Sequence, residues 1–207
     1  MLSLIHISAL RELKDGNARL LGGATDSGEG AQKVEAILGT ADEVRQAIPN
    51  LPVPSDLEPE GYWIYWNAAA DNPNLVVAGG DHAGLIYGVF ALFRLLATGQ
   101  DYTRLEVRSE PAFRIRWVDQ WDNPDGTIER GYAGRSIFFE GGEVRQDLAP
   151  VSEYARLLAS VGINGCNLNN VCLLYTSPCT YGLRITLIAS PVRSNSIACS
   201  NSPSFSR

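Results

Sequence analysis

The run from Arg114 to Phe139, which reads RIRWVDQWDNPDGTIERGYAGRSIFF, constrains the fold of this chain more than any other segment. Its residues alternate up to Trp121, which predicts a strand with one face made by every second residue: Phe113, Ile115, Trp117, Asp119 and Trp121. At Asp122 the alternation stops, and the sequence Asp-Asn-Pro-Asp-Gly that follows is typical of a turn. A strand that delivers an aromatic ring and carboxylates into an ordered loop is typical of α/β barrels, which build their sites at the carboxyl ends of their strands.

Two short peptides near the ends of the chain share one origin at the level of DNA. The string CTGTCTCTTATACACATCT encodes LSLIHI (2–7) in one frame and CLLYTS (172–177) in the next, and it is the end sequence of a transposase-based sequencing adaptor. Residues 172–207 also hold eight serines and no Asp, Glu or Lys. We therefore expect residues 1–8 to be a sequencing scar and residues 172–207 to be a non-native tail, with a serine-rich disordered tail as the alternative.

The part of the chain before residue 172 is acidic and poor in metal-binding side chains. It holds all 23 acidic residues and 14 of the 17 basic ones, a formal charge of −9, which argues against nucleic acid and anionic membranes as partners. Once both ends are set aside, Cys166 and His82 are the only cysteine and histidine, so no disulfide framework, zinc site or Cys–His pair can be assembled. Any chemistry must come from carboxylates, and we expect neither a metal nor a cofactor.

The first portion of the chain alternates between strand and helix patterns. A short strand is predicted at 18–22, and an amphipathic helix from about Ala31 to Ile48, where apolar residues recur at nearly helical spacing. The segments 61–67 and 74–79 are rich in β-branched and aromatic residues, which predicts two strands. Because neighbouring residues of a strand point to opposite faces, the tryptophans of the first of these strands are not expected to form one flat platform for a sugar.

A long apolar helix is predicted next. Asp81 can cap its start and Gly99 can follow its end. Because the helix is apolar on nearly every side, we expect it to be deeply buried. A membrane span is the competing interpretation, but Arg94 interrupts the run and the run is shorter than the roughly 20 residues that a bilayer requires. A strand at 103–108 then leads to Pro111, where we place a domain boundary.

The second portion contains a strand, a long loop, a helix and another strand. The helix is predicted to start at Asp147 or Ser152 and to end at Gly162, and the second strand follows at 163–171. This order predicts a parallel βα unit. Both strands end in polar or aromatic side chains: Trp121 and Asp122 on the first, Asn169 and Asn170 on the second. Two such ends side by side suggest one wall of a sugar site.

Two segments of this portion resemble the start of the catalytic (β/α)8 TIM barrel of glycoside hydrolase family 67, the xylan alpha-glucuronidases, and most of all its fungal-type members: IRWVDQWDNPDGTIERGYAGRSIFF and EYARLLASVGINGCNLNNV. The resemblance runs from Phe113 to Val171 and extends more weakly upstream through EGYWI and GLIYGVFALFRLL. Pro124 stands where the family usually has leucine, which suits a turn. The implied fold is α/β, with an N-terminal sandwich-like α/β domain at 9–110 and the first strands of an incomplete TIM barrel at 111–171.

The resemblance implies an inverting hydrolase that removes α-1,2-linked glucuronic acid, or its 4-O-methyl ether, from xylooligosaccharides. Such an enzyme needs a carboxylic acid and a carboxylate about 6.5 to 9.5 Å apart. In the family both come from later barrel strands, so we expect no catalytic residue in this chain and no activity from it alone. Two substrate-binding positions carry over by motif: Trp121, whose indole offers a flat face and an N–H donor, and Val171, which can accept a methoxy group.

The resemblance also implies aldouronic acids from glucuronoxylan as partners and an extracellular location, and it leaves open a homodimeric parent enzyme. Two other classes of function stay open: a carbohydrate-binding module that uses Trp121 and the tryptophan strand, and a non-catalytic α/β interaction domain. With only two barrel strands, both outer edges of this small sheet would be unpaired, so we expect the second portion to be unstable or prone to aggregation.

Other polar residues have structural interpretations. Asp122 and Asp125 are predicted to form the turn rather than an acid–base pair. Glu129, with Arg130 and Arg135, is predicted to fix the long loop through ion pairs. Trp117 is predicted to pack inside the fold, and the sequence Gly28-Glu29-Gly30 lacks the further residues of a phosphate-binding loop.

Overall fold

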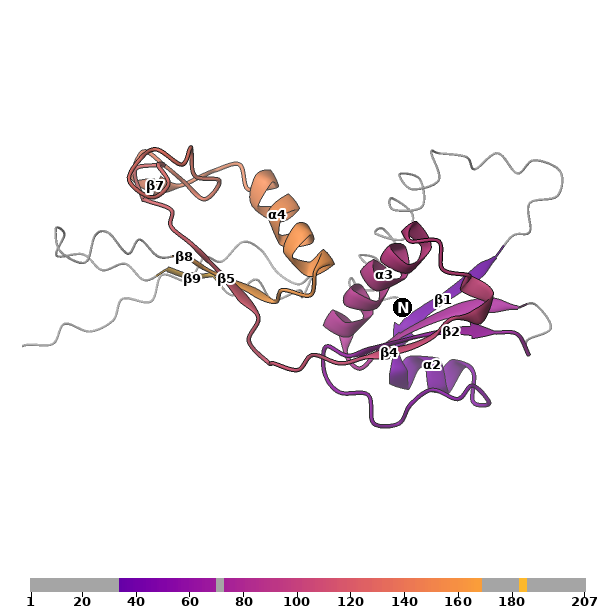
Figure 1. Ribbon diagram of the computed structural model, residues 1–207. Helices are drawn as coiled ribbons and strands as arrows, with labels where there is room; N and C mark the ends of the chain where they lie inside the picture. The colour runs from indigo at the N-terminus through magenta and orange to yellow at the C-terminus, as the bar shows by residue number, and fades with distance from the viewer. Residues whose placement is uncertain (1–33, 70–72, 169–182, 186–207) are drawn as a thin grey trace, which may run out of the picture. The chain divides into compact units, whose positions relative to one another are not determined.

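The chain forms two compact units that combine helices and sheets. The computed structural model describes residues 34–69, 73–168 and 183–185. The division between the units falls between Arg114 and Ile115, close to Pro111 (Figure 1). The strand predicted at 18–22 and the glycine pair at 28–30 lie outside the described residues.

The first unit is built on a four-stranded sheet with the order β1-β3-β2-β4. Strands β1 and β3 are parallel, whereas β2 runs antiparallel to both of its neighbours, β3 and β4. Helices α2 and α3 lie on opposite faces of the sheet (Figure 1). The elements of this unit are β1 (Glu35–Thr40), α2 (Ala41–Ala47), β2 (Tyr62–Asn67), β3 (Asn74–Gly79), α3 (His82–Ala97), the 3-10 turn η1 (Tyr102–Arg104) and β4 (Glu106–Ser109).

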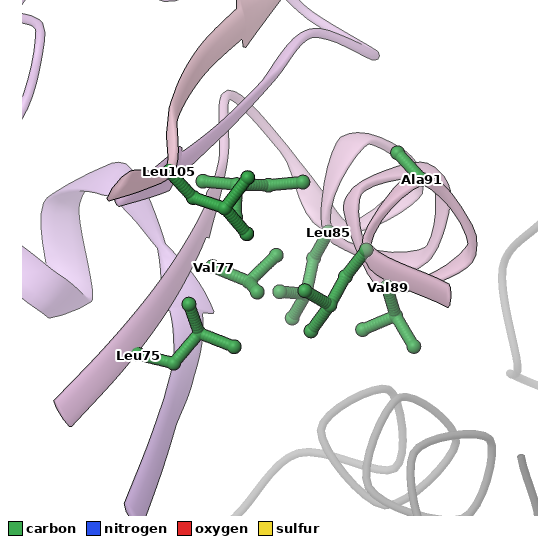
Figure 2. Packing of buried hydrophobic residues seen from close by; sticks show 8 residues of the cluster. Leu75, Val77, Leu85, Val89, Ala91 and Leu105 are labelled. Carbon is green, nitrogen blue, oxygen red and sulfur yellow. The ribbon is translucent and has the colours of Figure 1, made fainter. Parts of the chain in front are cut away.

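Helix α3 packs on one face of this sheet through a purely apolar cluster. Figure 2 shows Leu85 and Val89 of the helix beside Leu75 and Val77 of β3, with Leu105 closing the cluster from the start of β4. All of these side chains are buried. At about 1.5 to 3 kcal/mol for each large apolar side chain removed from water, this cluster is a main source of stability in the first unit.

The opposite face of the sheet is covered by α2 and by the segment that follows it. Val44 of the helix and Val53 of the segment are buried against Trp63, Val76 and Ala78. Trp63 is 3% exposed and stacks on Tyr65, with 4.7 Å between the ring centroids. The sheet is therefore buried on both faces, which explains why all six residues of β3 are buried.

The two tryptophans of β2 point to opposite faces, as predicted. Trp63 lies in the core on the side of α2, whereas Trp66 packs edge-on against Tyr102 on the side of α3. A flat double-tryptophan platform for a sugar is thus excluded on this strand.

The helix predicted from Ala31 to Ile48 is wrong in its first half. Residues Glu35–Thr40 form β1, and the helix starts only at Ala41. Neighbours Ile37 and Leu38 pack into the clusters on opposite faces of the sheet, which is the geometry of a buried strand. The apolar spacing fitted a helix because a strand that is buried on both faces carries apolar residues without alternation.

Helix α3 begins and ends where the sequence predicts. The Asp81 side chain caps it by accepting a hydrogen bond from the Gly84 amide at 2.8 Å, and Gly99 follows the helix with a φ of 76°. The expected deep burial holds for the side that faces the sheet, where Leu85 and Val89 are fully buried, but not near the end of the helix, where Leu96 is 39% exposed.

Glycines let the start of α3 approach the loop before β2. A Cβ on Gly84 would lie 2.0 Å from the Gly61 carbonyl oxygen, and one on Gly80 would lie 2.0 Å from the Glu58 carbonyl oxygen. Backbone therefore fills the space that a side chain would need at both positions, and only glycine allows this close approach.

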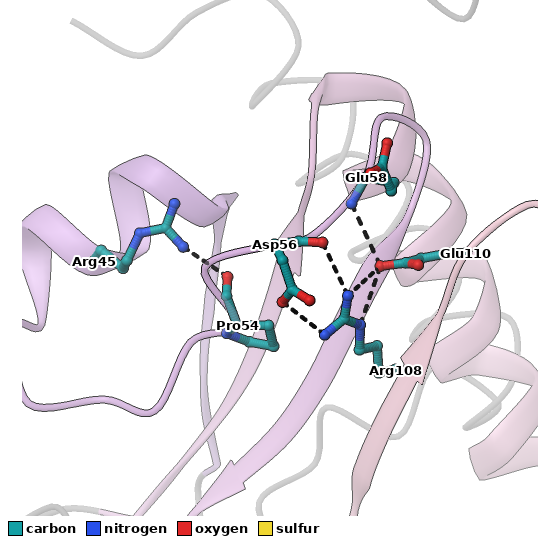
Figure 3. Close-up of polar contacts among 6 residues, drawn as sticks. All are labelled: Arg45, Pro54, Asp56, Glu58, Arg108 and Glu110. Atoms are coloured by element: carbon teal, nitrogen blue, oxygen red, sulfur yellow. Dashed lines mark hydrogen bonds and ion pairs between the residues drawn. The ribbon is translucent and has the colours of Figure 1, made fainter.

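A group of charges ties this loop to the edge strand β4 (Figure 3). The Arg108 guanidinium donates to Asp56 Oδ1 at 2.9 Å and to Glu110 Oε1 at 2.6 Å, while Glu110 also accepts from the Glu58 amide at 3.4 Å. The hydrogen bond from Arg108 lowers the pKa of Asp56 below its ordinary value. These groups are largely exposed, so they direct the path of the loop more than they stabilise the unit.

The second unit contains the predicted parallel βα unit. Its first strand, β5 (Trp117–Gln120), pairs in parallel with β8 (Gly165–Leu168), and α4 (Ala149–Ser160) connects them. Two short strands, β6 (Phe139–Glu140) and β7 (Glu143–Val144), form a hairpin in the long loop. The backbone of β9 (Leu183–Ile185) pairs antiparallel with the other edge of β8. The prediction that this edge of β8 stays open is therefore wrong.

Strand β5 is shorter than the alternation predicts. Phe113 and Ile115, which were expected on its inner face, are 74% and 65% exposed and precede the strand. Helix α4 starts at Ala149, where Asp147 Oδ1 accepts a hydrogen bond from the Ala149 amide at 2.9 Å. Asp147 rather than Ser152 thus marks its start.

Candidate functional site

The carboxyl end of β5 is the candidate site, because the small β5–β8 sheet presents very different side chains on its two faces. On one face Val118, Cys166 and Leu168 form a core with Leu158 of α4. The Gln120 amide also points to this side, where it donates a short hydrogen bond to the hydroxyl group of Tyr154 in α4. This face is closed by the helix.

The opposite face is polar and aromatic. Asp119 lies directly across from Asn167 in the parallel register, and its Oδ1 accepts a hydrogen bond from Asn167 Nδ2 at 2.8 Å. Trp121 Nε1 donates to the other carboxylate oxygen, Asp119 Oδ2, at 3.3 Å. Trp121 is 42% exposed. A large aromatic ring that is held by polar contacts while much of it stays in solvent is typical of a binding surface.

Trp117 covers the base of this polar face. A Cβ at Gly165 would lie only 2.2 Å from Trp117 Nε1, so the indole ring lies across the backbone of β8 at a place where no side chain projects. This close contact agrees with the packing role predicted for Trp117. It also explains why β8 starts with a glycine.

The loop after β5 is held by backbone and amide groups. The Glu129 amide donates to the Trp121 carbonyl oxygen at 2.7 Å, and Glu129 adopts a φ of 55°, which is unusual for a residue other than glycine. The Asn123 side chain donates to Thr127 Oγ1 at 2.7 Å and to the Glu129 carbonyl oxygen at 2.8 Å. The main chain of Trp121 is therefore fixed by a loop that folds back on it.

Asp125 forms the turn, as predicted. Its Oδ1 accepts hydrogen bonds from the Thr127 amide at 2.9 Å and from the Thr127 hydroxyl at 2.7 Å, and the hydroxyl bond lowers the pKa of Asp125. Of the ion-pair network expected from Glu129, Arg130 and Arg135, the part that involves Glu129 is wrong, because Glu129 makes no ion pair with any residue that the structure describes. Glu129 contributes through its backbone instead.

Asp122 differs from the simple turn residue that the sequence suggests. It is only 5% exposed, and its Oδ1 has no hydrogen-bond partner among the residues that the structure describes. Burial raises the pKa of Asp122, although a hydrogen bond from the Ser136 hydroxyl opposes the shift. Ser136 Oγ in turn accepts from the Phe138 and Phe139 amides at 3.0 Å each. The carboxyl group of Asp122 thus belongs to the inner side of the loop.

The two carboxylates lie in different surroundings. Asp119 is exposed on the polar face, where it accepts from Trp121 and Asn167, whereas Asp122 is buried and accepts from the Ser136 hydroxyl. An acid and a base that flank one glycosidic bond must both face the substrate, and these two carboxylates do not share one exposed surface. The described part of the site can hold a ligand, but it does not assemble an acid–base pair.

The remaining reactive groups near the site are inert. Burial raises the pKa of Cys166 to about 11, and the nearby carboxylates of Asp122 and Asp119 add to this shift. The thiol is therefore protonated at neutral pH. Within residues 34–69 and 73–168 no three His, Cys, Asp or Glu side chains gather as metal ligands, and no helix of that part is long and apolar enough to cross a membrane.

Of the two predicted substrate-binding residues, the structure describes one. Trp121 stands at the carboxyl end of β5 with its ring partly exposed, and Val171, like Asn169 and Asn170, lies outside the described residues. Sequence reasoning missed Asp119 and Asn167 as partners. Alternation along each strand could have placed Asp119 on the same face as Trp121. The register that sets Asp119 opposite Asn167 cannot be derived from one sequence.

Comparisons with known proteins match segments of both units. Residues 5–92 match the model for the glycosyl hydrolase family 67 N-terminus, and residues 95–193 match the model for the glycosyl hydrolase family 67 middle domain. The two matches are consecutive along the chain and together span most of it.

The chain belongs to glycosyl hydrolase family 67.

Several fungal proteins are similar to this family 67 chain. It is 42% identical over 135 residues to the probable alpha-glucuronidase A of Aspergillus niger. This aligned segment is 65% of this chain and 15% of that protein. It is 41% identical over 135 residues to the alpha-glucuronidase A of Aspergillus tubingensis, with the same coverage. With the probable alpha-glucuronidase A of Aspergillus fumigatus the identity is 39% over 163 residues, 78% of this chain and 19% of that protein. The matched segment thus spans less than one fifth of each of these relatives.

Proposed function

We propose that this family 67 chain is part of an inverting alpha-glucuronidase that removes α-1,2-linked glucuronic acid, or its 4-O-methyl ether, from xylooligosaccharides during xylan breakdown. The observation that carries the proposal is the run of family matches through both units, together with relatives that are named alpha-glucuronidases. The substrates are then aldouronic acids derived from glucuronoxylan.

In this proposal β5, α4 and β8 are the first strand, helix and second strand of a (β/α)8 barrel. Support comes from the parallel pairing of β5 and β8 and from the single helix that covers one of their faces. In such a barrel helices cover the outside and active sites lie at the carboxyl ends of the strands. The face that carries Asp119 and Trp121 then becomes the inner face, and Trp121 stands at the rim where substrate binds.

The proposed division of labour assigns substrate binding, and no catalytic step, to this chain. Trp121 and Val171 form part of the wall that holds the uronic acid. The catalytic acid and base come from strands other than β5 and β8. The burial of Asp122 beside Ser136, while Asp119 is exposed with Trp121, supports this assignment, since an acid and a base must both face the sugar.

Two further expectations belong to the same proposal. We expect an extracellular enzyme that meets xylan fragments outside the cell, as the resemblance to fungal-type members of the family implies. A homodimeric enzyme is the assembly that we consider for the whole protein. Both stay predictions.

The decisive experiment starts from the gene. The reading frame through residues 9–171 is recovered from fresh genomic DNA, and the complete product is expressed and incubated with aldotriouronic acid. We expect release of glucuronic acid, first as the β-anomer in proton NMR spectra, because the reaction inverts the α-linkage. The 207-residue chain in the same assay is the control and should release none. A frame that stops at Val171, or a complete product without activity, would contradict the proposal.

The carbohydrate-binding module is weakened as an alternative. Its tryptophan strand is not available, because Trp63 is buried beneath α2 and Trp66 faces the other side of the sheet. Only Trp121 offers an exposed indole of the kind that this alternative requires among residues 34–69 and 73–168.

A further inference from the structure

We propose that Asp119 is a positioning residue that fixes the indole ring of Trp121 by holding its N–H group, so that Trp121 meets a sugar through the flat face of its ring. The proposal deepens the function proposed above and rests on it for the nature of the ligand. It revises the expectation that the indole N–H donates to the sugar.

Asp119 is itself anchored from the neighbouring strand. Its Oδ1 accepts from Asn167 Nδ2 at 2.8 Å, and Asn167 lies directly opposite it in the register of β5 and β8. Its second oxygen, Oδ2, accepts from Trp121 Nε1 at 3.3 Å. A chain of two hydrogen bonds therefore runs from β8 through the carboxylate to the indole.

The spacing in the sequence makes this contact possible. Residues two apart on a strand point to the same face, so Asp119 stands directly before Trp121 at the end of β5. An indole has one donor, and a hydrogen bond to a carboxylate is stronger than one to a neutral acceptor. The bond therefore favours one orientation of a ring that is 42% exposed.

The main chain of Trp121 is held independently. The Glu129 amide donates to the Trp121 carbonyl oxygen at 2.7 Å, and Asp122 pairs with Ile128 in an isolated bridge. The loop thus sets where the residue stands, while Asp119 sets how its ring is turned. With the N–H donating to Asp119, the rest of the indole, which carries no other polar atom, is left to meet a ligand.

An apolar ring surface recognises a sugar by stacking against its C–H groups and not by a directed hydrogen bond. Such a contact depends on the orientation of the ring but not on the donor. Phenylalanine can replace tryptophan in this role, whereas alanine cannot. This difference gives the proposal a test.

The first experiment measures the ring directly. The full chain is labelled with ¹⁵N-tryptophan, and the Trp121 indole signal is assigned by its loss in Trp121→Phe. We expect Asp119→Ala to shift this signal and to speed its exchange with water, whereas Asp119→Asn, which keeps an oxygen acceptor, restores most of the protection. The indole signals of Trp63 and Trp66 in the first unit are internal controls and should not move.

A merely structural role for Asp119 predicts another result. It would change the exchange of backbone amides in β5 and β8 along with the indole, in both variants. If backbone and indole respond together, or if the Trp121 indole does not respond to Asp119→Ala at all, the proposal is overturned.

The second experiment asks how the ring meets the ligand. The full chain is titrated with aldotetraouronic acid by calorimetry. We expect Trp121→Phe to bind within about threefold of the unsubstituted chain and Trp121→Ala to bind about tenfold or more weakly, which corresponds to about 1.4 kcal/mol. Equal losses in both variants would show that the N–H reaches the sugar and would overturn the proposal. Absence of binding by the unsubstituted chain would count against the proposed substrate site, while the exchange experiment still decides the role of Asp119.

Discussion

The two units differ in what their sheets do with their second face. In the first unit helix α3 covers one face and α2, with the segment after it, covers the other. In the second unit α4 covers one face of β5 and β8, and the other face carries Asp119, Asn167 and Trp121. The sheet of the first unit is therefore buried on both faces, whereas the β5–β8 sheet of the second unit has one buried face and one polar face on which Trp121 is partly exposed.

The comparison predicts the largest effect in the core beneath α3. Leu85→Ala removes a fully buried side chain between the helix and β3, and we expect a loss of about 2 to 5 kcal/mol in the free energy of unfolding. Urea denaturation of the full chain, followed by circular dichroism, measures it. Leu96→Ala on the exposed side of the same helix is the matched control and should cost much less. Similar losses in the two variants would contradict the conclusion that the side of α3 facing the sheet stabilises the first unit.

A smaller effect is expected where the second unit is most tightly packed. Gly165→Ala places a methyl group against the Trp117 indole, and we expect a loss of about 1 to 3 kcal/mol, because a rigid ring must move. Thermal unfolding and tryptophan fluorescence report the change. In the double variant with Trp117→Leu most of the loss should return, since the smaller side chain makes room. If stability does not recover, Gly165 is required for the backbone conformation of β8 and not for the contact with the Trp117 ring.

The helix caps sharpen the contrast further. Asp81→Ala removes an acceptor that serves the amides of both Gly84 and Glu60, so we expect a loss of about 0.5 to 2 kcal/mol from the first unit. Asp81→Asn keeps an oxygen acceptor and is the control. Helix α4 has no side-chain cap at Leu148, and Leu148→Ser should leave the second unit unchanged or slightly more stable. Chemical denaturation with one spectroscopic probe in each unit separates these effects.

The smallest effect is a dependence of stability on pH that arises from Asp122. Burial raises the pKa of this carboxyl above its ordinary value of 3.8, so the folded chain binds the proton more tightly than the unfolded chain. The protonated Asp122 carboxyl therefore stabilises the folded chain relative to the ionised one. This stabilisation is fully present below pH 3.8 and is lost as pH rises through the higher pKa of the folded state. We expect the difference in the free energy of unfolding between Asp122→Asn and the original chain to favour the variant more at pH 7 than at pH 3. Urea titrations at several pH values test this, and a difference that grows in acid would contradict it.

Much of the first unit could be predicted because its signals are local. Asp81 and Gly99 mark the two ends of α3, and β2 and β3 follow the segments rich in β-branched and aromatic residues. The prediction of a helix from Glu35 to Thr40 was wrong, because this segment belongs to the sheet through its pairing with β3, some 40 residues away. Helical spacing and a strand with two buried faces look alike in one sequence.

The site was predictable in outline and not in detail. The turn at Asp125 and the approximate end of β5 follow from turn chemistry and alternation, whereas Trp121 was singled out by the resemblance to family 67. The partners of these residues do not, because the contact between Asp119 and Asn167 depends on the register of two strands that lie 48 residues apart. The burial of Asp122 was also missed, since it depends on how Ser136 returns beneath the loop.

The clamp around Arg108 has a mechanical consequence. Strand β4 is held to the sheet by only four residue pairs, and its last pair, Ser109 with Tyr62, lies nearest to the linker that leads to the second unit. Tension along the linker would peel β4 away from this end, one pair at a time. The bonds from Arg108 to Asp56 and from the Glu58 amide to Glu110 lie at that same end (Figure 3). These contacts join the loop before β2 to the last residues of β4, so they have to break when that end of the strand leaves the sheet.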